Sequence, residues 1–174
     1  SARRLLEESL EIGRRVGDLW HVAHVLNSMG ALSSGLDEHE EARNFHRESL
    51  DLFRQLGNRR GAAAALNNLG VEASALGDYP EAARLYRESL AIFQELGDRW
   101  GSAFALGNLG GTYQDMGEYA EAERLSLEGL AVFQEVGDRW GMASTLCNLG
   151  DITQALGKRP DSRRYFSQAL EMAV

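Results

Sequence analysis

Two histidines stand at a spacing that would let them share a metal ion. His21 and His24 are three residues apart, which places both imidazoles on one face of a helix. No cysteine or carboxylate recurs near them at the spacing of a zinc ligand set, so we expect no metal site. We interpret His39 and His46 as packing or solvated side chains. Cys147 has no dedicated base in the sequence, so it is not predicted to be a catalytic nucleophile.

One short segment is similar to the end of a phosphate-binding loop. Gly157 and Lys158 have the right types, but Arg159 stands where a serine or threonine would hold magnesium. Gly77 and Gly117 occupy the same place in earlier parts of the chain, which indicates a structural turn. The many aspartates and glutamates are interpreted as a solvated helix face. The sequence therefore predicts no enzymatic activity and no cofactor.

Asparagines recur in the sequence and offer chemistry for binding. Asn68, Asn108 and Asn148 are forty residues apart, and Asn27 and Asn67 add to them. An amide is both a donor and an acceptor, which suits it to the N–H and C=O groups of an extended peptide. Alternatively, each asparagine bonds the neighbouring part of the chain and sets how the repeats stack. We favour peptide contact and expect the amides of the first three to have no backbone partner within the chain.

Composition excludes several classes of partner. The 174 residues contain 18 Lys and Arg against 26 Asp and Glu, for a net charge of −8. A nucleic-acid or anionic-membrane binder needs a basic surface, so neither partner is expected. No apolar run approaches the roughly 18 residues of a membrane-spanning helix, and one cysteine excludes internal disulfides. We therefore expect a cytoplasmic protein with an ordinary hydrophobic core.

A period of forty residues organises the chain. Residues 91–110 and 131–150 are identical at most positions. Gly70, Gly110 and Gly150 recur inside predicted helices, where glycine costs up to about 1 kcal/mol relative to alanine. We attribute them to close approach of the partner helix, with Ala82 and Ala122 as the small residues opposite.

Apolar residues between the turns have helical spacing. The pattern predicts one helix over Tyr79 to Leu96 and a second over Arg99 to Met116. Asp78 stands at the start of the first as a candidate N-cap. Each unit is thus a helical hairpin, and because one hairpin cannot bury its own apolar face, the units must stack into a solenoid.

The repeated segments carry a family resemblance. NLG at 68–70 followed by GDYPEA at 77–82 resembles the tetratricopeptide repeat. Gln94 and Gln134 stand where the common form has a proline, and the unit is similar to the forty-residue variants of kinesin light chain, spindle-orientation adaptors and bacterial signal-transduction sensors. The resemblance implies an all-α right-handed superhelix of about nine helices. It also implies a protein–protein interaction module, within a larger bacterial signalling or regulatory protein.

In the family that the chain resembles, the first helix of each unit lines a concave groove. Its face is polar, small and nearly uncharged, and the expected peptide-binding residues are His24, Asn27, Asn67, Asn68, Phe104, Asn108, Gln114, Asn148, Asp151 and Gln154. No lysine or arginine occurs in 61–77, 101–117 or 141–157. We therefore expect an extended peptide that is neutral or basic.

The register predicts one repeat domain over residues 1–174. It contains units 23–62, 63–102, 103–142 and 143–174, preceded by the second helix of a truncated unit at 1–22, as in a fragment of a larger protein. The apolar stripes of the first and last helices lack their usual neighbours, which predicts end-to-end association between copies. The faces concerned carry Leu5, Leu6, Ser9, Leu10 and Val16 at one end, and Tyr165, Phe166, Leu170, Met172 and Val174 at the other. A structural, self-associating arm without a peptide ligand is the alternative function.

Overall fold

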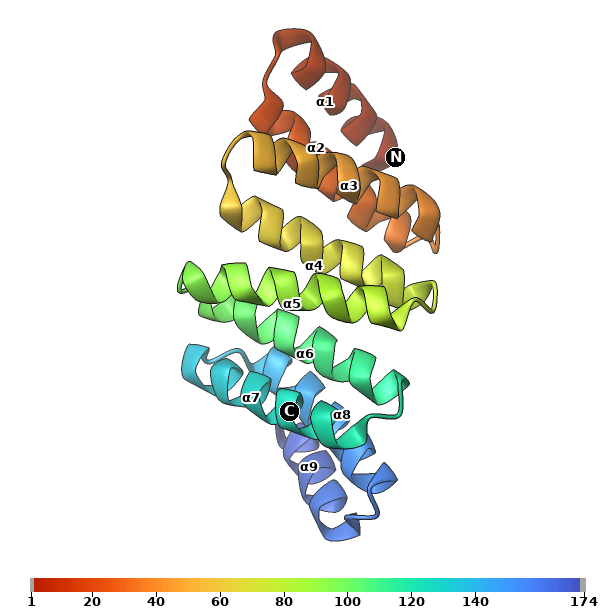
Figure 1. The fold of residues 1–174 in the computed structure, drawn as a ribbon, viewed down its shortest axis with the longest axis vertical. Coiled ribbons are helices and arrows are strands. Elements are labelled where there is room, and N and C mark those ends of the chain that lie inside the picture. The colour runs from red at the N-terminus through yellow and green to blue at the C-terminus, as the bar shows by residue number, and fades with distance from the viewer. Residues whose placement is uncertain (1, 173–174) are drawn as a thin grey trace. The chain divides into compact units, whose positions relative to one another are not determined.

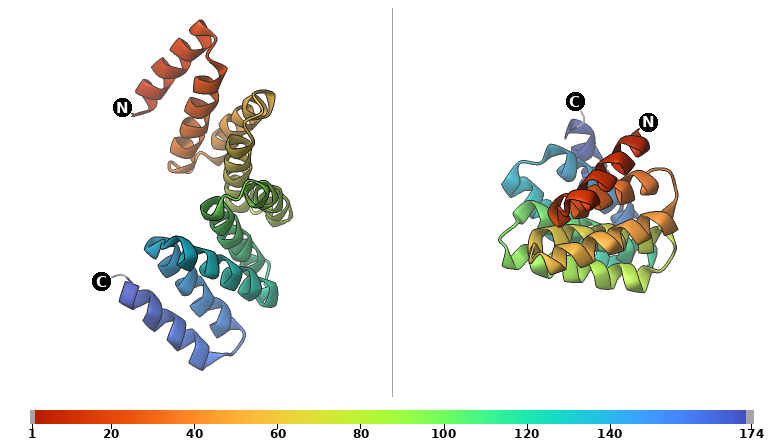
Figure 2. Two further views of the ribbon diagram at one scale, coloured as in Figure 1. Left: turned by 90° about the vertical axis from the view of Figure 1, so that its left-hand side faces the viewer. Right: turned by 90° about the horizontal axis from the view of Figure 1, so that it is seen from above.

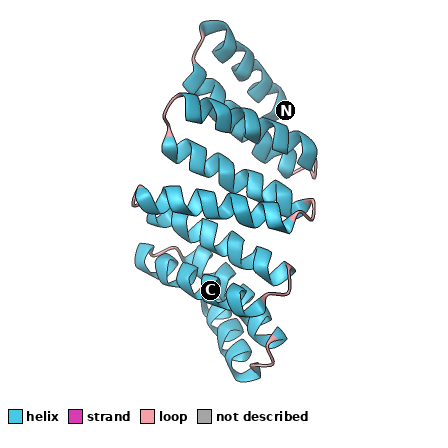
Figure 3. Cartoon of the chain, viewed as in Figure 1, coloured by secondary structure: helices cyan, strands magenta, loops and turns pink. Residues whose placement is uncertain are grey.

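The computed structural model describes residues 2–172, and every regular element in that range is an α-helix. The nine helices there follow each other with short turns and no strand between them (Figures 1 and 3), which confirms the predicted all-α fold class. None of them is both long and apolar enough to cross a membrane. Their bounds are α1 Ala2–Val16, α2 Leu19–Ser34, α3 His39–Gln55, α4 Arg59–Ala75, α5 Tyr79–Glu95, α6 Arg99–Asp115, α7 Tyr119–Val136, α8 Arg139–Ala155 and α9 Arg159–Met172.

Repeated polar caps begin the first helix of each hairpin. Asp18, Asn58, Asp98 and Asp138 each accept a hydrogen bond at 2.9 Å from the backbone N–H three residues later. The turns before and after carry glycines with φ between 66° and 79°, a left-handed conformation that L side chains rarely adopt. Asp37 takes this conformation without being glycine, with φ 61°. The helices end one residue earlier than the sequence predicted for α5 and α6.

The chain divides into two compact units, which we describe separately. Unit 1 covers residues 1–92 and unit 2 covers residues 93–174. Consecutive helices pack as antiparallel pairs within each unit, for example α1 with α2 and α8 with α9 (Figure 2). The predicted superhelix and single domain remain predictions.

Each unit has its own apolar core. In unit 1, Leu10 packs with four residues of α2, which are Val22, Val25, Leu26 and Met29. In unit 2, the core joins one residue of α7 to two of α8 and two of α9, namely Leu130, Leu146, Leu149, Tyr165 and Ala169.

The terminal helices are better covered than the sequence predicted. The expectation that Leu10 and Tyr165 lack cover is wrong, because each is only 8% exposed. Leu10 is buried in the cluster that it forms with α2, and Tyr165 is buried in the cluster that joins α9 to α7 and α8. Other positions are open as expected, with Leu5 63% and Leu170 70% exposed. Val174 lies outside the described residues. Val16 and Phe166 are also exposed, and Leu6 and Met172 are half-buried.

Glycines inside the first helices mark close helix–helix contacts. A Cβ atom on Gly70 would lie 2.6 Å from the Tyr86 ring, and one on Gly110 would lie 2.8 Å from Ser126 Oγ. The predicted close approach is present: the Ala122 carbonyl oxygen lies 3.5 Å from a Cβ placed on Gly110, whereas the atoms nearest to Gly70 belong to Tyr86 rather than to Ala82. The residue one turn further along the partner helix reaches across and lies on the glycine.

Candidate interaction surface

Unit 2 brings several of the predicted groove residues into one small pocket. Phe104, Gly107 and Asn108 of α6 lie opposite Ser144 and Asn148 of α8. The pocket has a volume of about 100 Å³ and no charged residue in its lining. Its other lining residues are Phe133, Trp140, Gly141 and Thr145. We call this the α6–α8 pocket.

Aromatic rings form one wall of the α6–α8 pocket. The Phe104 ring lies 4.2 Å from that of Trp100 and stacks at 6.2 Å and 16° on that of Trp140. Trp100 Nε1 donates to Asp138 Oδ2 at 3.1 Å, which fixes that indole. Trp140 is 70% exposed and is available for contact. Sequence reasoning missed the tryptophans, although Trp20, Trp100 and Trp140 share one repeat position.

The asparagines of the α6–α8 pocket differ in their surroundings. The Asn148 side chain is half-buried and has no hydrogen bond within residues 2–172. Asn108 has an interaction within the chain. A Cβ atom on Gly107 would meet no atom within 4 Å, so this position leaves open space beside the amides.

The remaining predicted groove residues of unit 2 do not join this pocket. Gln114 is half-buried, whereas Asp151 and Gln154 are exposed. Gln154 lines a different hollow with residues of α9.

In unit 1, two predicted groove asparagines bond to each other. Asn68 Nδ2 donates to Asn27 Oδ1 at 3.1 Å, which links α4 to α2. Asn27 Oδ1 also lies 3.1 Å from His46 Nδ1. Asn68 therefore contributes to stacking, though through a side chain rather than the backbone. His24 is exposed and packs its ring 4.1 Å from that of Trp20, while Asn67 has an interaction within the chain.

Behind this asparagine pair lies a buried polar cluster. The Glu72 side chain is 1% exposed, and its Oε2 lies 2.9 Å from His39 Nδ1. His46 Nε2 lies 4.0 Å from Glu72 Oε1. Burial lowers the pKa of His46 to about 4, against a smaller opposite effect of the Glu72 charge. Burial raises the pKa of Tyr86, and the Glu72 charge adds to this effect.

The buried cluster was not predicted from the sequence. Glutamates were expected on solvated faces, but Glu72 shares its repeat position with Thr112 and Ile152, which are also buried. This shared repeat position was the signal in the sequence that could have predicted the burial of Glu72. Within residues 2–172, no three His, Cys, Asp or Glu side chains are placed to hold a metal ion.

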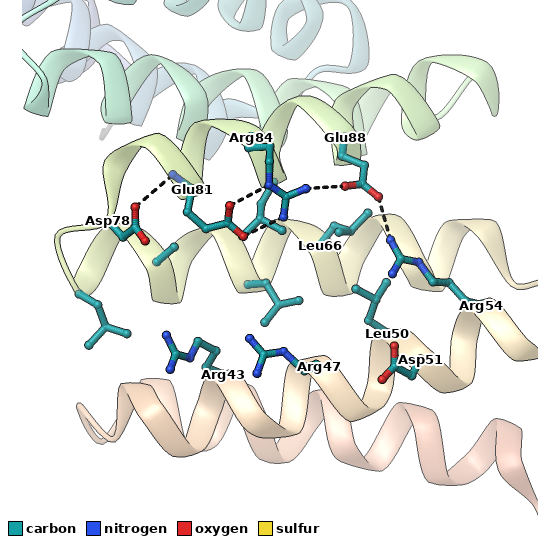
Figure 4. Close-up of a pocket in the computed structure, with 14 residues that line it drawn as sticks. Arg43, Arg47, Leu50, Asp51, Arg54, Leu66, Asp78, Glu81, Arg84 and Glu88 are labelled. Atoms are coloured by element: carbon teal, nitrogen blue, oxygen red, sulfur yellow. Dashed lines mark hydrogen bonds and ion pairs between the residues drawn. The ribbon is translucent and has the colours of Figure 1, made fainter.

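A larger groove in unit 1 is formed by α3, α4 and α5 (Figure 4). It has a volume of about 550 Å³ between α3 and α5, above the side chains of α4. We call it the arginine groove. Its lining residues are Arg43, Arg47, Leu50, Asp51, Arg54, Leu66, Leu69, Ala73, Leu76, Asp78, Glu81, Arg84, Leu85 and Glu88.

Ion pairs close part of the arginine groove. Arg84 holds both oxygens of Glu81 at 2.7 Å and reaches Glu88 at 3.2 Å. Glu88 also accepts from Arg54 of α3 at 2.8 Å, which bridges the groove (Figure 4). The bond from Arg84 holds the pKa of Glu81 below its usual value, with a smaller contribution from the charge of Arg47.

An exposed thiol lies beside an apolar pocket of unit 2. Cys147 is exposed and shares this pocket, of about 410 Å³, with Trp140 and Leu170. Ala143, Ser144, Phe166 and Ala169 complete the lining.

Comparison with known proteins bears on the fold. A family model described as tetratricopeptide repeat matches residues 21–95 and 101–173. No curated protein sequence matches the chain.

Several solved structures resemble the chain at low sequence identity. BtubC (BKLC) from P. vanneervenii matches 99% of this chain and 72% of its own, with a TM-score of 0.88 and 21% identity. The apo form of RapI matches 99% of this chain and 70% of its own, with a TM-score of 0.82 and 14% identity. The structure of a putative kinesin light chain with TPR-like repeats from Podosopora anserina matches 99% of this chain and 85% of its own, with a TM-score of 0.75 and 17% identity. At these identities the likeness concerns the fold.

Proposed function

Because the chain belongs to the tetratricopeptide repeat family, we propose that it is a protein–protein interaction module that binds an extended peptide at the α6–α8 pocket. The observation that carries the proposal is the pocket itself, which joins uncharged polar groups to an exposed aromatic wall. This family is generally a non-catalytic interaction scaffold. The absence of enzymatic activity in this chain remains a prediction.

The polar side of the pocket suits a peptide backbone. The Asn148 amide has an N–H donor and a C=O acceptor to offer, and the Ser144 hydroxyl is exposed one turn away. Gly107 leaves room for the backbone to approach α6. The aromatic wall adds apolar contact with little loss of conformational entropy. Since no charged residue lines the pocket, an uncharged peptide stretch fits best, and neutral to basic partners follow from the overall charge of −8.

Selection of peptides tests the proposal. We would select phage-displayed random peptides on the whole chain and measure their affinity for variants by calorimetry. Gly107→Leu fills the pocket and should abolish binding, whereas Ala131→Leu adds a similar side chain on the exposed face of α7 and should not. Asn148→Ala should weaken binding about 5- to 100-fold, as expected for one or two lost hydrogen bonds. Peptides that bind Gly107→Leu as tightly as the original chain would refute the site.

Exposed apolar residues favour a second role in self-association. Leu5 on α1 and Leu170 on α9 are more than 60% exposed, and each lies on a helix with other open apolar side chains. We therefore keep end-to-end association between copies as a proposal. Light scattering over a concentration series should show a rising mass that Leu5→Ser and Leu170→Ser abolish. A constant monomer mass at high concentration would contradict it.

Two broader expectations rest on the repeat resemblance. A place within a larger bacterial signalling or regulatory protein follows from the repeat resemblance alone and remains a proposal. A cytoplasmic location likewise remains a proposal.

A further inference from the structure

One arginine of the arginine groove, Arg47, is exposed and makes no direct bond within residues 2–172, although its charge acts on Glu81. Arg47 has neither a hydrogen bond nor an ion pair within the described residues, although it lines the groove. The other arginines on the walls are engaged, Arg54 with Glu88 and Arg84 with Glu81 and Glu88. The lack of a direct bond is therefore specific to one end of the groove.

A second arginine at the same end is only partly satisfied. Arg43 pairs with Glu40 at 2.6 Å, but its Nε is out of contact with solvent and has no hydrogen-bond partner. Buried donors without a partner are rare, and an acceptor supplied by a ligand would explain this one. Arg43 and Arg47 are one turn apart on α3, and their guanidinium groups lie side by side in Figure 4, with no dashed line to another lining residue.

Asp51, Asp78 and Glu81 also line the groove, but none of them makes a hydrogen bond or ion pair with Arg47. Glu81 of α5 is held by two bonds from Arg84, so its carboxylate stays on its own helix. Beside the two arginines, the lining includes apolar side chains of Leu50, Leu69 and Leu76, the last 42% exposed.

We propose that the arginine groove binds an acidic segment of a protein partner, with a carboxylate between Arg43 and Arg47 and an apolar side chain on the leucines beside them. This site lies outside the α6–α8 pocket and does not depend on it. A guanidinium pair recognises carboxylate oxygens through charge-assisted hydrogen bonds. The volume of about 550 Å³ exceeds what one small ion fills, and the apolar lining favours a protein segment over a free anion.

A short probe peptide tests the charge requirement. Acetyl-Leu-Glu-Glu-Leu-amide would be titrated into the ¹⁵N-labelled whole chain while NMR follows the side-chain Nε–H signals of arginines. We expect saturable shifts at Arg43 and Arg47. The Leu-Gln-Gln-Leu analogue should bind about tenfold more weakly, since it lacks the charge.

Variants separate a specific site from general electrostatics. Arg47→Gln should weaken the probe about tenfold, and Arg47→Lys should recover only part of this because lysine lacks the planar fork. Arg15→Gln removes the same charge from the exposed side of α1 and should leave affinity unchanged. Equal weakening by Arg15→Gln, or equal affinity of the glutamine peptide, would overturn the proposal. Inorganic phosphate that saturates the same signals at lower concentration than the peptide would overturn the choice of a protein segment as the ligand.

Discussion

Replacing Gly70 by alanine tests the helix contact that the repeat glycines create. The new Cβ would lie 2.6, 2.8 and 2.9 Å from three ring atoms of Tyr86, closer than real Cβ contacts. Tyr86 is only 3% exposed, so its ring has no space to move into. Overpacking of this kind costs about 1–3 kcal/mol, and the better helix propensity of alanine returns about 1 kcal/mol. The net change is a loss of up to about 2 kcal/mol.

Gly107 provides the matched control within a helix of the same type. Its added Cβ would meet no atom within 4 Å, so Gly107→Ala should stabilise the chain by about 0.5–1 kcal/mol. Urea unfolding followed by circular dichroism measures both variants against the original chain. The second change Tyr86→Ala in the Gly70→Ala background should remove the clash, so the two losses should be less than additive. If Gly70→Ala is as stable as Gly107→Ala, the reasoning from close contact is refuted.

Three further results are expected. His46 has a pKa of about 4 in the folded chain against 6.5 when unfolded, so its contribution to the free energy of unfolding is complete above pH 6.5. Roughly 3 kcal/mol of that free energy should be lost as the pH falls from 6.5 to 4. His46→Gln should flatten this pH dependence in urea titrations. Asp138→Ala removes the acceptor of Gly141 N–H and of Trp100 Nε1. The free energy of unfolding should fall by about 1–2 kcal/mol, and fluorescence anisotropy should show a more mobile indole. Unchanged stability would contradict the role of Asp138 as a helix cap. Cys147 should react fully with a thiol reagent in the folded chain, because it is exposed, and a masked thiol would contradict its placement.

The fold followed from the sequence because its signals are local. The cap at Asp78 and the turn glycine Gly117 each depend on a few neighbouring residues, and both are where the sequence predicted them. The face of a helix that carries Asn68 was also predictable. What that face meets was not, because the amide partner, Asn27, lies forty-one residues earlier and belongs to another hairpin. Residue spacing therefore predicts the helix face on which a side chain lies, whereas the residue that it contacts depends on how the hairpins pack.

The same limit explains the two main omissions. Glu72 was assigned to solvent on its residue type, although its repeat register matched buried positions. Trp140, at the first turn of α8, is 70% exposed, and the sequence analysis did not single it out. Both cases require knowledge of which hairpin lies on each side.

The buried Glu72 also gives the repeats a fixed order. Its carboxylate is matched by His39 and His46 on the preceding hairpin, whereas the later hairpin carries Tyr119 and Ser126 at the corresponding positions. If the unit 63–102 were transplanted to follow unit 103–142, the carboxylate would be buried without an imidazole beside it, a loss of several kcal/mol. Similar repeats in this chain are therefore not interchangeable modules. The buried Glu72 side chain therefore restricts which unit can precede unit 63–102 without leaving a buried carboxylate unmatched.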